Sequence, residues 1–208
     1  MTVELGRAAH VRSGIQIEVV TVAWMVLEAL IAVGAGIAAS SLLLIAFGVD
    51  SLIELVSGLV LLWRLIVEAQ GGDVGRAEGA EGRARWIVAI ALAVLCAYVL
   101  ATAIYGLVTQ ERPESSPVGI ALAIAAMLVM PWLAFTKRRI AGQIDSEALR
   151  ADAACSLTCG YMAGTVLLGL ALNAALHWWW AEDVAALGFL FWLLGETREA
   201  FEEARESA

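Results

Sequence analysis

The chain of 208 residues is 61% hydrophobic, with a mean hydropathy of +0.82 and a formal net charge of −8. Soluble globular domains are about 45–50% apolar, so this composition excludes a soluble domain and predicts an integral membrane protein. No basic patch is present, so nucleic acid is not an expected partner. The three cysteines all lie in apolar runs, which argues against an extracellular disulfide framework.

The apolar runs are long enough to cross a bilayer, for which a helix needs about 20 mostly apolar residues. The first run is longer than the core of a signal peptide and no small-residue cleavage site follows it, so we expect a span there. Three tryptophans, Trp178 to Trp180, precede the last run and are typical of a membrane-interface anchor. The predicted spans are residues 16–38, 42–66, 86–108, 117–136, 147–175 and 183–195. The fold class is therefore predicted to be all-α, an integral membrane bundle of six transmembrane helices.

The segments outside the spans are short. Residues 1–15 are expected to form a cytoplasmic N-terminal tail, residues 16–195 the six-helix transmembrane domain, and residues 196–208 a short cytoplasmic C-terminal helix or tail. Residues 71–85, GGDVGRAEGAEGRAR, are rich in glycine and charge and predict a flexible cytoplasmic linker.

Charge asymmetry predicts the orientation. Of the 13 basic residues, only Arg112 falls in a connection on the opposite side from the others. The positive-inside rule then places both termini in the cytoplasm, which requires an even number of spans. We expect a multi-pass protein of a bacterial inner (plasma) membrane. The other basic residues are Arg7, Arg12, Arg64, Arg76, Arg83, Arg85, Lys137, Arg138, Arg139, Arg150, Arg198 and Arg205.

Two acidic residues interrupt the second apolar run. In IAFGVDSLIELVSG, residues 45–58, Asp50 and Glu54 are four apart and share one face of a helix. Two carboxylates there repel each other, and each costs about 2.5–3.5 kcal/mol in the membrane interior. One interpretation is a structural polar pair that hydrogen-bonds to neighbouring helices. The other is a cation site, in which a bound dication removes the repulsion.

A pair of thiols in the fifth run favours the cation site. Cys155 and Cys159 are also four apart, on one face with Asp152 and Ser156. Two oxygen and two sulfur ligands suit a tetrahedral ion such as zinc. Without the ion we expect at least one acid to be protonated, so the site could exchange a metal ion for protons. The alternative is that both cysteines are small buried packing residues.

Other ionisable residues in the spans have open roles. Asp152 could be a carboxylate in an outer shell of the site, a ligand on the way in, or a helix-start charge that faces the cytoplasm. Glu28 has no evident partner and could face the site or relay protons. Glu18 is expected near the interface, in contact with solvent. The spacing Gly160-x-x-x-Gly164 predicts close helix packing, either within the chain or between two copies.

The motifs resemble one known family. Residues 47–58, FGVDSLIELVSG, resemble the second-span signature of the cation diffusion facilitators (cation efflux family), an acidic residue or histidine four before an acidic residue. Residues 146–164, SEALRADAACSLTCGYMAG, resemble its fifth-span region. When the two are matched on RAD, the family's pair of fifth-span ligands falls on Cys155 and Cys159. Residues 178–189, WWWAEDVAALGF, resemble the start of its sixth span.

The resemblance implies a homodimeric exchanger that moves Zn²⁺, or Cd²⁺, Co²⁺ or Fe²⁺, out of the cytosol against protons. Access would alternate around a mid-membrane site of Asp50, Glu54, Cys155 and Cys159, with Asp152 and Glu28 as possible accessory residues. No prosthetic group is expected; the ion is cargo. The chain departs from the family pattern, because cysteines replace the usual histidine and aspartate, and because the 2–3 and 4–5 loops lack histidine. It most resembles the short, transmembrane-only branch that lacks the C-terminal cytoplasmic domain.

A second hypothesis is a membrane metal sensor, chaperone or scaffold on the same fold, which would bind the ion without moving it. An intramembrane enzyme is not expected, because the chain has no Ser/His pair and no H-E-x-x-H motif.

Overall fold

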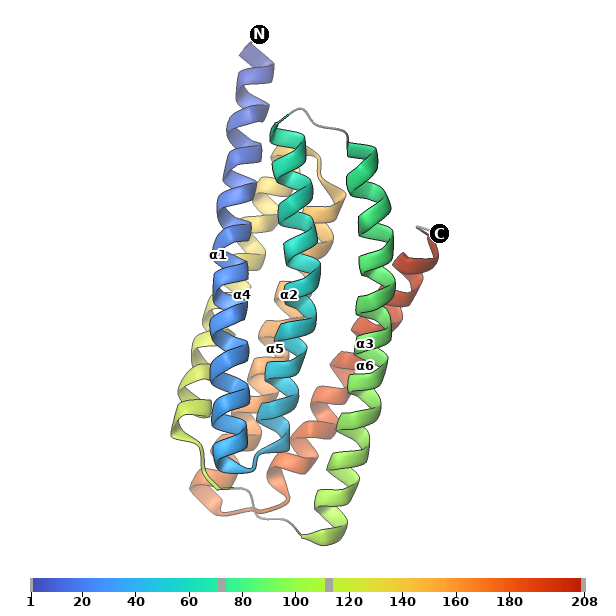
Figure 1. The fold of residues 1–208 in the computed structure, drawn as a ribbon. Coiled ribbons are helices and arrows are strands. Elements are labelled where there is room, and N and C mark those ends of the chain that lie inside the picture. Colours follow the sequence, from blue (N-terminus) through green and yellow to red (C-terminus); the bar gives the residue numbers. More distant parts are fainter. Residues whose placement is uncertain (1, 71–73, 111–113, 207–208) are drawn as a thin grey trace.

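The computed structural model describes residues 2–70, 74–110 and 114–206, and these are almost entirely helical. The helices alternate in direction along the bundle (Figure 1), and consecutive helices are antiparallel neighbours except for α3 and α4, which lie apart. They are α1 (Thr2–Ala39), α2 (Leu42–Ala69), α3 (Val74–Thr109), α4 (Pro117–Ile144), α5 (Glu147–Leu176) and α6 (Ala181–Glu206).

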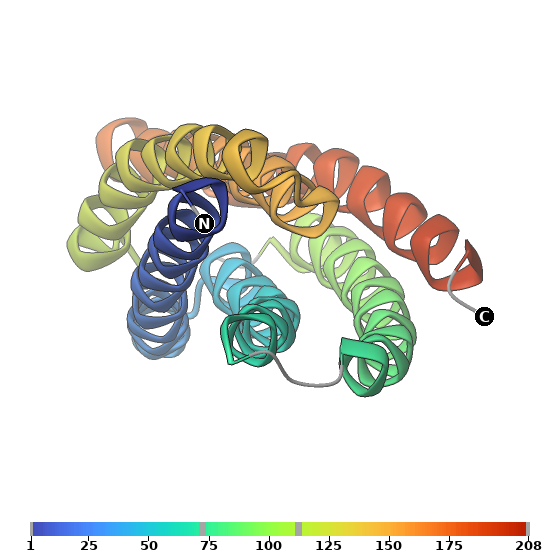
Figure 2. The same cartoon turned by 90° about the horizontal axis from the view of Figure 1, so that it is seen from above.

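The six helices form two rows of three. Seen from above (Figure 2), α1, α2 and α3 make one row and α4, α5 and α6 make the other. Across the interface between the rows, α1 packs on α4 and α3 packs on α6, while α2 and α5 face each other in the middle. Of the three facing pairs, α2 and α5 are the least closely packed. The predicted ligands lie on these two central helices.

Within the described residues, five helical segments are long and apolar enough to cross a membrane: His10–Ala39, Leu42–Val67, Trp86–Thr109, Pro117–Ile144 and Asp152–Leu176. Large apolar side chains cover the outside of the bundle, among them Leu30 and Val108, which suits contact with lipid. The all-α membrane bundle predicted from composition is therefore confirmed. Helix α6 is not among the five, and its crossing stays a prediction that its packing along α3 and α5 supports.

Helix ends follow from local capping signals. Ser116 caps α4 by accepting a hydrogen bond from the Gly119 amide at 3.1 Å, and Pro117 occupies the first helical turn. Ser146 caps α5 in the same way, accepting from the Leu149 amide at 3.3 Å. Between α4 and α5, Asp145 is in the left-handed conformation with φ of 53°, so the chain reverses over two residues. This tight turn holds α4 and α5 side by side.

Two expectations about segment ends were wrong. Helix α3 already begins at Val74, so residues 74–85 are helical and not a flexible linker; residues 71–73 lie outside the described part. Alanine, arginine and glutamate between the glycines are strong helix formers that extend the apolar helix. Helix α1 begins at Thr2, so the expected N-terminal tail is helical from that residue, and its place in the cytoplasm stays a prediction. Helix α4 continues to Ile144, so Lys137 lies in a helix and not in a loop.

Two glycines bring α1 and α2 unusually close. A Cβ atom at Gly36 would lie 2.7 Å from Ile45 Cγ1, and one at Gly48 would lie 2.9 Å from the Val33 amide nitrogen. Contacts this short are not possible for a real Cβ, so only glycine allows this approach. The crossing fixes α2 against α1 two residues before Asp50.

Candidate metal centre

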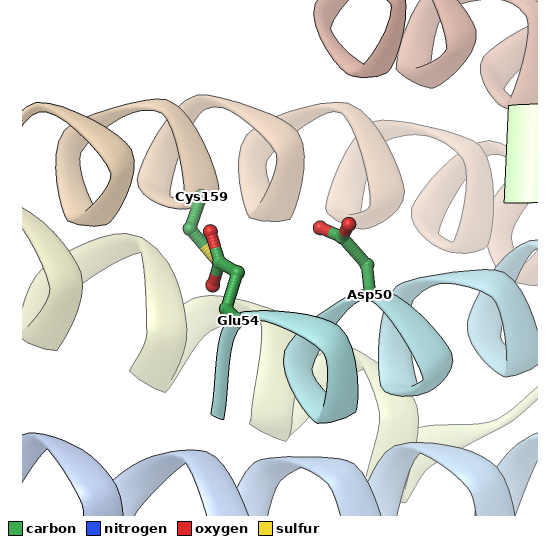
Figure 3. A group of neighbouring side chains, drawn as sticks. All are labelled: Asp50, Glu54 and Cys159. Atoms are coloured by element: carbon green, nitrogen blue, oxygen red, sulfur yellow. The ribbon is translucent and has the colours of Figure 1, made fainter. Parts of the chain in front are cut away.

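Three of the predicted ligands meet between α2 and α5. A carboxylate oxygen of Asp50, a carboxylate oxygen of Glu54 and the Cys159 sulfur all lie within 4.8 Å of one another. Figure 3 shows the two carboxylates pointing from α2 toward α5, with Cys159 beside Glu54. Asp50 and Cys159 are fully buried, and Glu54 keeps 7% of its surface exposed. The spacing of four residues predicted from the sequence thus places Asp50 and Glu54 on the face that α5 covers.

The two carboxylates have no hydrogen-bond partner among the described residues. All four oxygens, Oδ1 and Oδ2 of Asp50 and Oε1 and Oε2 of Glu54, are buried and unsatisfied. A buried carboxylate in this state is costly unless it is protonated or paired with a cation. Two oxygen-donor side chains and a thiol form a ligand set for a borderline divalent ion. The alternative interpretation of the sequence was a structural pair that hydrogen-bonds to neighbouring helices. The described residues do not provide such hydrogen bonds to either carboxylate.

Glu28 of α1 borders this group. Its Oε1 accepts a hydrogen bond from Ser51 Oγ at 2.8 Å and its Oε2 accepts one from Trp24 Nε1 at 2.5 Å. Cys159 Sγ lies 3.9 Å from Glu28 Oε1, in reach of a sulfur hydrogen bond. Glu28 therefore has the partners that the sequence did not reveal, and it touches the site through Cys159. A carboxylate in this position fixes the direction of a ligand side chain.

Cys155 does not join the group. Its side chain is exposed, and it lies in the wall of a cavity of about 80 Å³ together with Glu54 and Ser57. Cys155 precedes Cys159 by one helical turn, which is about 6 Å along α5. The structure thus separates the two thiols, and whether Cys155 ligates an ion stays a prediction.

The cavity lies on one side of the two carboxylates. Residues of α1, α2, α3, α5 and α6 line it, and from Glu54 to Ser57 and from Cys155 to Asp152 they follow α2 and α5 toward the end of the bundle that carries the N-terminus and the α4–α5 turn (Figure 1). On the other side of the carboxylates, one turn beyond Asp50, the fully buried Phe47 packs edge-on against Phe189 of α6, with ring centroids 6.5 Å apart. The carboxylate group thus borders a cavity toward one end of the bundle and packed aromatic rings toward the other.

A buried polar network holds the closed end together. Glu182, at the start of α6, accepts a hydrogen bond from Asn173 Nδ2 of α5 at 2.7 Å and another from the Ser41 hydroxyl. Glu182 is 3% exposed and Ser41 is fully buried. The network ties the beginning of α2 to the end of α5 and the beginning of α6.

A buried ion cluster lies between α1, α4 and α5. The ammonium group of Lys137, which is fully buried, is 3.2 Å from Glu18 Oε2 and pairs with Asp152. It also donates to Ser156 Oγ at 3.3 Å. The expectation that Glu18 contacts solvent was wrong, because Glu18 is fully buried beside Lys137. Asp152, whose role was left open, lies at the cavity wall with its carboxylate held by Lys137.

Sequence reasoning missed Lys137, Glu18 and Glu196 as residues of the interior. The pattern of buried residues contains the missing signal: Lys137 continues the buried stripe Met130, Ala134, Ala141 and Ile144 of α4 at spacings of three and four. Glu196 likewise follows buried Phe189 and Leu193 on α6. Gly160 and Gly164 pack within the chain, against Pro131 and Met127 of α4.

Comparison with known proteins agrees with this architecture. The model of the cation efflux transmembrane domain matches residues 19–207. The cation-efflux pump FieF of Cronobacter sakazakii is 29% identical over 159 residues, which cover 74% of this chain and 52% of that protein. An uncharacterized transporter, sll1263, of Synechocystis is 27% identical over 184 residues, or 78% of this chain and 57% of that protein.

The chain spans about half the length of the relatives it matches. The matched region includes all six helices except the beginning of α1, and it contains the whole Asp50, Glu54 and Cys159 group. The family match covers far more than half of the chain. The chain therefore belongs to the cation efflux family.

Proposed function

We propose that this protein exports a divalent metal cation, zinc in the first place, from the cytosol in exchange for protons. Asp50, Glu54 and Cys159 are the proposed buried ligands, and Cys155 is proposed to bind the ion one helical turn away, in the cavity. The observation that carries the proposal is the meeting of two unpartnered carboxylates and a thiol within 4.8 Å in the interior of a membrane bundle. The match to the cation efflux transmembrane domain, and the name of the FieF relative as a cation-efflux pump, support it.

The ligand set supports a borderline or soft ion. A thiolate favours Zn²⁺ or Cd²⁺ over Mn²⁺ or Mg²⁺, and two carboxylates with one thiolate can neutralise a dication and leave one negative charge. Thiolates also bind tightly, so release of the ion is expected to be the slow step. Co²⁺ and Fe²⁺ are the further candidates for cargo.

Basic residues support the direction of transport. The cavity lies between the carboxylates and the end of the bundle where Arg138 and Arg139 of α4 and Arg198 of α6 lie, and basic residues favour the cytoplasmic side. On this basis both termini are cytoplasmic, and the conformation described here opens inward. The closure around Phe47 and Phe189 would have to open for the ion to leave.

Proton exchange follows from the chemistry of the ligands. Carboxylic acids and a thiol must lose their protons before they bind the ion, so loading releases protons to the cytosol. When the ion leaves on the other side, protons from that side return to the same groups. The ion and the protons therefore compete for one site, which couples their movements in opposite directions. The resemblance to the family also supports a homodimer.

Flux through reconstituted vesicles tests the proposal. Proteoliposomes with a pH gradient are loaded with an indicator, and uptake of Zn²⁺, Cd²⁺, Co²⁺, Fe²⁺ and Mn²⁺ is followed together with internal pH. We expect Zn²⁺ uptake with proton movement in the opposite direction, and we expect Asp50→Asn to abolish it. Cys96→Ser is the control and should keep the uptake, because Cys96 is a buried cysteine whose sulfur contacts Thr197 and not the metal centre. If the protein binds Zn²⁺ and moves none, the export proposal fails and the sensor or chaperone hypothesis replaces it.

A further inference from the structure

The cavity beside the candidate metal centre contains more ligand-type side chains than that centre uses. Its wall includes Glu54, Asp152, Cys155, Glu196 and Glu199, from three different helices. Asp152 is held by Lys137, and Glu199 lies one helical turn beyond Glu196 toward the C-terminal end of α6. Glu54, Cys155 and Glu196 remain as side chains that could bind an ion inside the cavity.

Glu196 of α6 is the unexplained residue among them. It is only 9% exposed, and its Oε1 is buried without a hydrogen-bond partner among the described residues. The negative charge of its carboxylate is repelled by the carboxylates of Glu54 and Asp50. Lys137, a fully buried cation of the bundle, is engaged by Glu18 and Asp152. The buried carboxylates of Asp50, Glu54 and Glu196 thus share one region, and none of them pairs with a basic side chain of the described residues, an arrangement that favours a bound cation.

The helices set these donors at two levels. On α2, Glu54 follows Asp50 by one turn toward the cavity mouth, and on α5, Cys155 precedes Cys159 by one turn toward the same mouth. The donors Asp50, Glu54 and Cys159 form the deeper level. Glu54, Cys155 and Glu196 line the outer level, in the cavity. Glu54 belongs to both.

We propose that Glu54, Cys155 and Glu196 form a second cation position, at which Zn²⁺ or Cd²⁺ binds before it moves inward to Asp50, Glu54 and Cys159. This inference rests on the proposed function and names the route by which its site is filled. Each position offers two carboxylates and one thiolate, so both select the same class of borderline to soft ion. Because Glu54 is shared, the ion moves by exchanging Cys155 and Glu196 for Cys159 and Asp50 without leaving Glu54. The two positions are therefore filled by one ion in turn.

A variant that lacks the deeper position tests the outer one. In Asp50→Asn/Cys159→Ala, Cd²⁺ is titrated into the purified full chain in nanodiscs, and binding is read from the ultraviolet thiolate-to-cadmium absorbance. Size-exclusion profiles and thermal unfolding verify that each variant is folded. We expect one Cd²⁺ to bind with one thiolate. Glu196→Gln in this background should weaken binding at least about tenfold, because even the loss of a residue that only holds a ligand in place costs about 10–100-fold in affinity. Glu202→Gln, an exposed acid on the same helix that pairs with Arg198, is the matched control and should leave binding unchanged.

A kinetic measurement tests the route in the chain that keeps the deeper position. After rapid mixing with Cd²⁺, Glu196→Gln alone is expected to slow the growth of the thiolate absorbance at least about tenfold. The final amplitude should stay that of Cys159 coordination.

The outcomes separate the two proposals. The second position is overturned, and the proposed function stands, if Glu196→Gln and Glu202→Gln show the same Cd²⁺ affinity and the same rate of binding. The same conclusion follows if Asp50→Asn/Cys159→Ala binds no Cd²⁺ while the natural chain does. If the natural chain binds no Cd²⁺ at all, both proposals fall.

Discussion

The buried ammonium nitrogen of Lys137 lies 3.2 Å from Glu18 Oε2, and the same nitrogen pairs with Asp152. One side chain of α4 thus joins α1 to α5 in the interior, close to the mouth of the cavity. One positive charge faces two negative charges there, so removal of the lysine leaves two acids buried together.

Lys137→Met should therefore destabilise the protein. Loss of one partner of a buried ion pair costs about 3–5 kcal/mol, because the remaining charges are left uncompensated. Thermal unfolding in detergent measures the change, with Arg138→Ala, an exposed neighbour on α4, as the control expected to stay within about 0.5 kcal/mol. The triple variant Lys137→Met/Glu18→Gln/Asp152→Asn should regain most of the loss. Equal stability of Lys137→Met and Arg138→Ala would contradict the role given to the ion cluster.

Glu28→Ala should weaken metal binding without removing a ligand. Glu28 Oε1 lies 3.9 Å from Cys159 Sγ and is itself fixed by Ser51. Loss of such a supporting group typically costs 10–100-fold in affinity. Cd²⁺ titration read by thiolate absorbance gives the affinity, and Glu28→Gln, which keeps an oxygen acceptor, should lose less than Glu28→Ala. Unchanged affinity in Glu28→Ala would mean that Glu28 only hydrogen-bonds to Ser51 and Trp24 and does not support metal binding by Cys159.

Cys159→Asp should shift the preference among ions. The change replaces the only thiol of the buried group by a third carboxylate, and oxygen ligands suit Mn²⁺ better than Cd²⁺. Competition between the two ions for uptake into proteoliposomes measures the ratio, which should move toward Mn²⁺ by about tenfold or more. Cys96→Ser changes a buried thiol outside the group and should leave the ratio as it is. A ratio that is the same in Cys159→Asp and in the natural chain would exclude Cys159 as a ligand.

Cys155 should be reactive from one side of the membrane. It is exposed in the wall of a cavity that lies between the carboxylates and the proposed cytoplasmic end of the bundle, whereas Cys96 and Cys159 are buried. In Cys96→Ser/Cys159→Ser, a membrane-impermeant maleimide is expected to label Cys155 in inside-out vesicles and not in right-side-out vesicles. Labelling from the outside alone would reverse the orientation proposed from the basic residues.

The sequence was informative about single helices and less so about their partners. Ser116 before Pro117, and Ser146 before Glu147, are capping signals, and α4 and α5 begin where these signals predict. The spacing of Asp50 and Glu54 correctly placed both carboxylates on one buried face of α2. Each of these features depends on residues within a few positions of one another.

The pairings between helices could not be read in the same way. Lys137, at the polar end of α4, was assigned to a loop because charge there is typical of a membrane boundary, yet its register puts it on the buried stripe of the helix. Glu18 and Glu28 likewise share the buried stripe of α1 with Val11, Met25 and Ala32. Which acid meets the lysine and which meets the thiol depends on how α1, α4 and α5 pack, and the period of one helix does not contain that information.

At the glycine crossing of α1 and α2, the position of Asp50 depends on the absence of a Cβ atom at Gly36 and Gly48. A methyl group at residue 48 would lie 2.9 Å from the Val33 amide nitrogen, so α2 would have to retreat from α1. Asp50, two residues along, would be carried with it while Cys159 stayed on α5. A change as small as Gly48→Ala would then alter which ion fits, although residue 48 never touches the ion. Inherited differences in metal tolerance between close relatives could thus arise at positions where no ligand has changed.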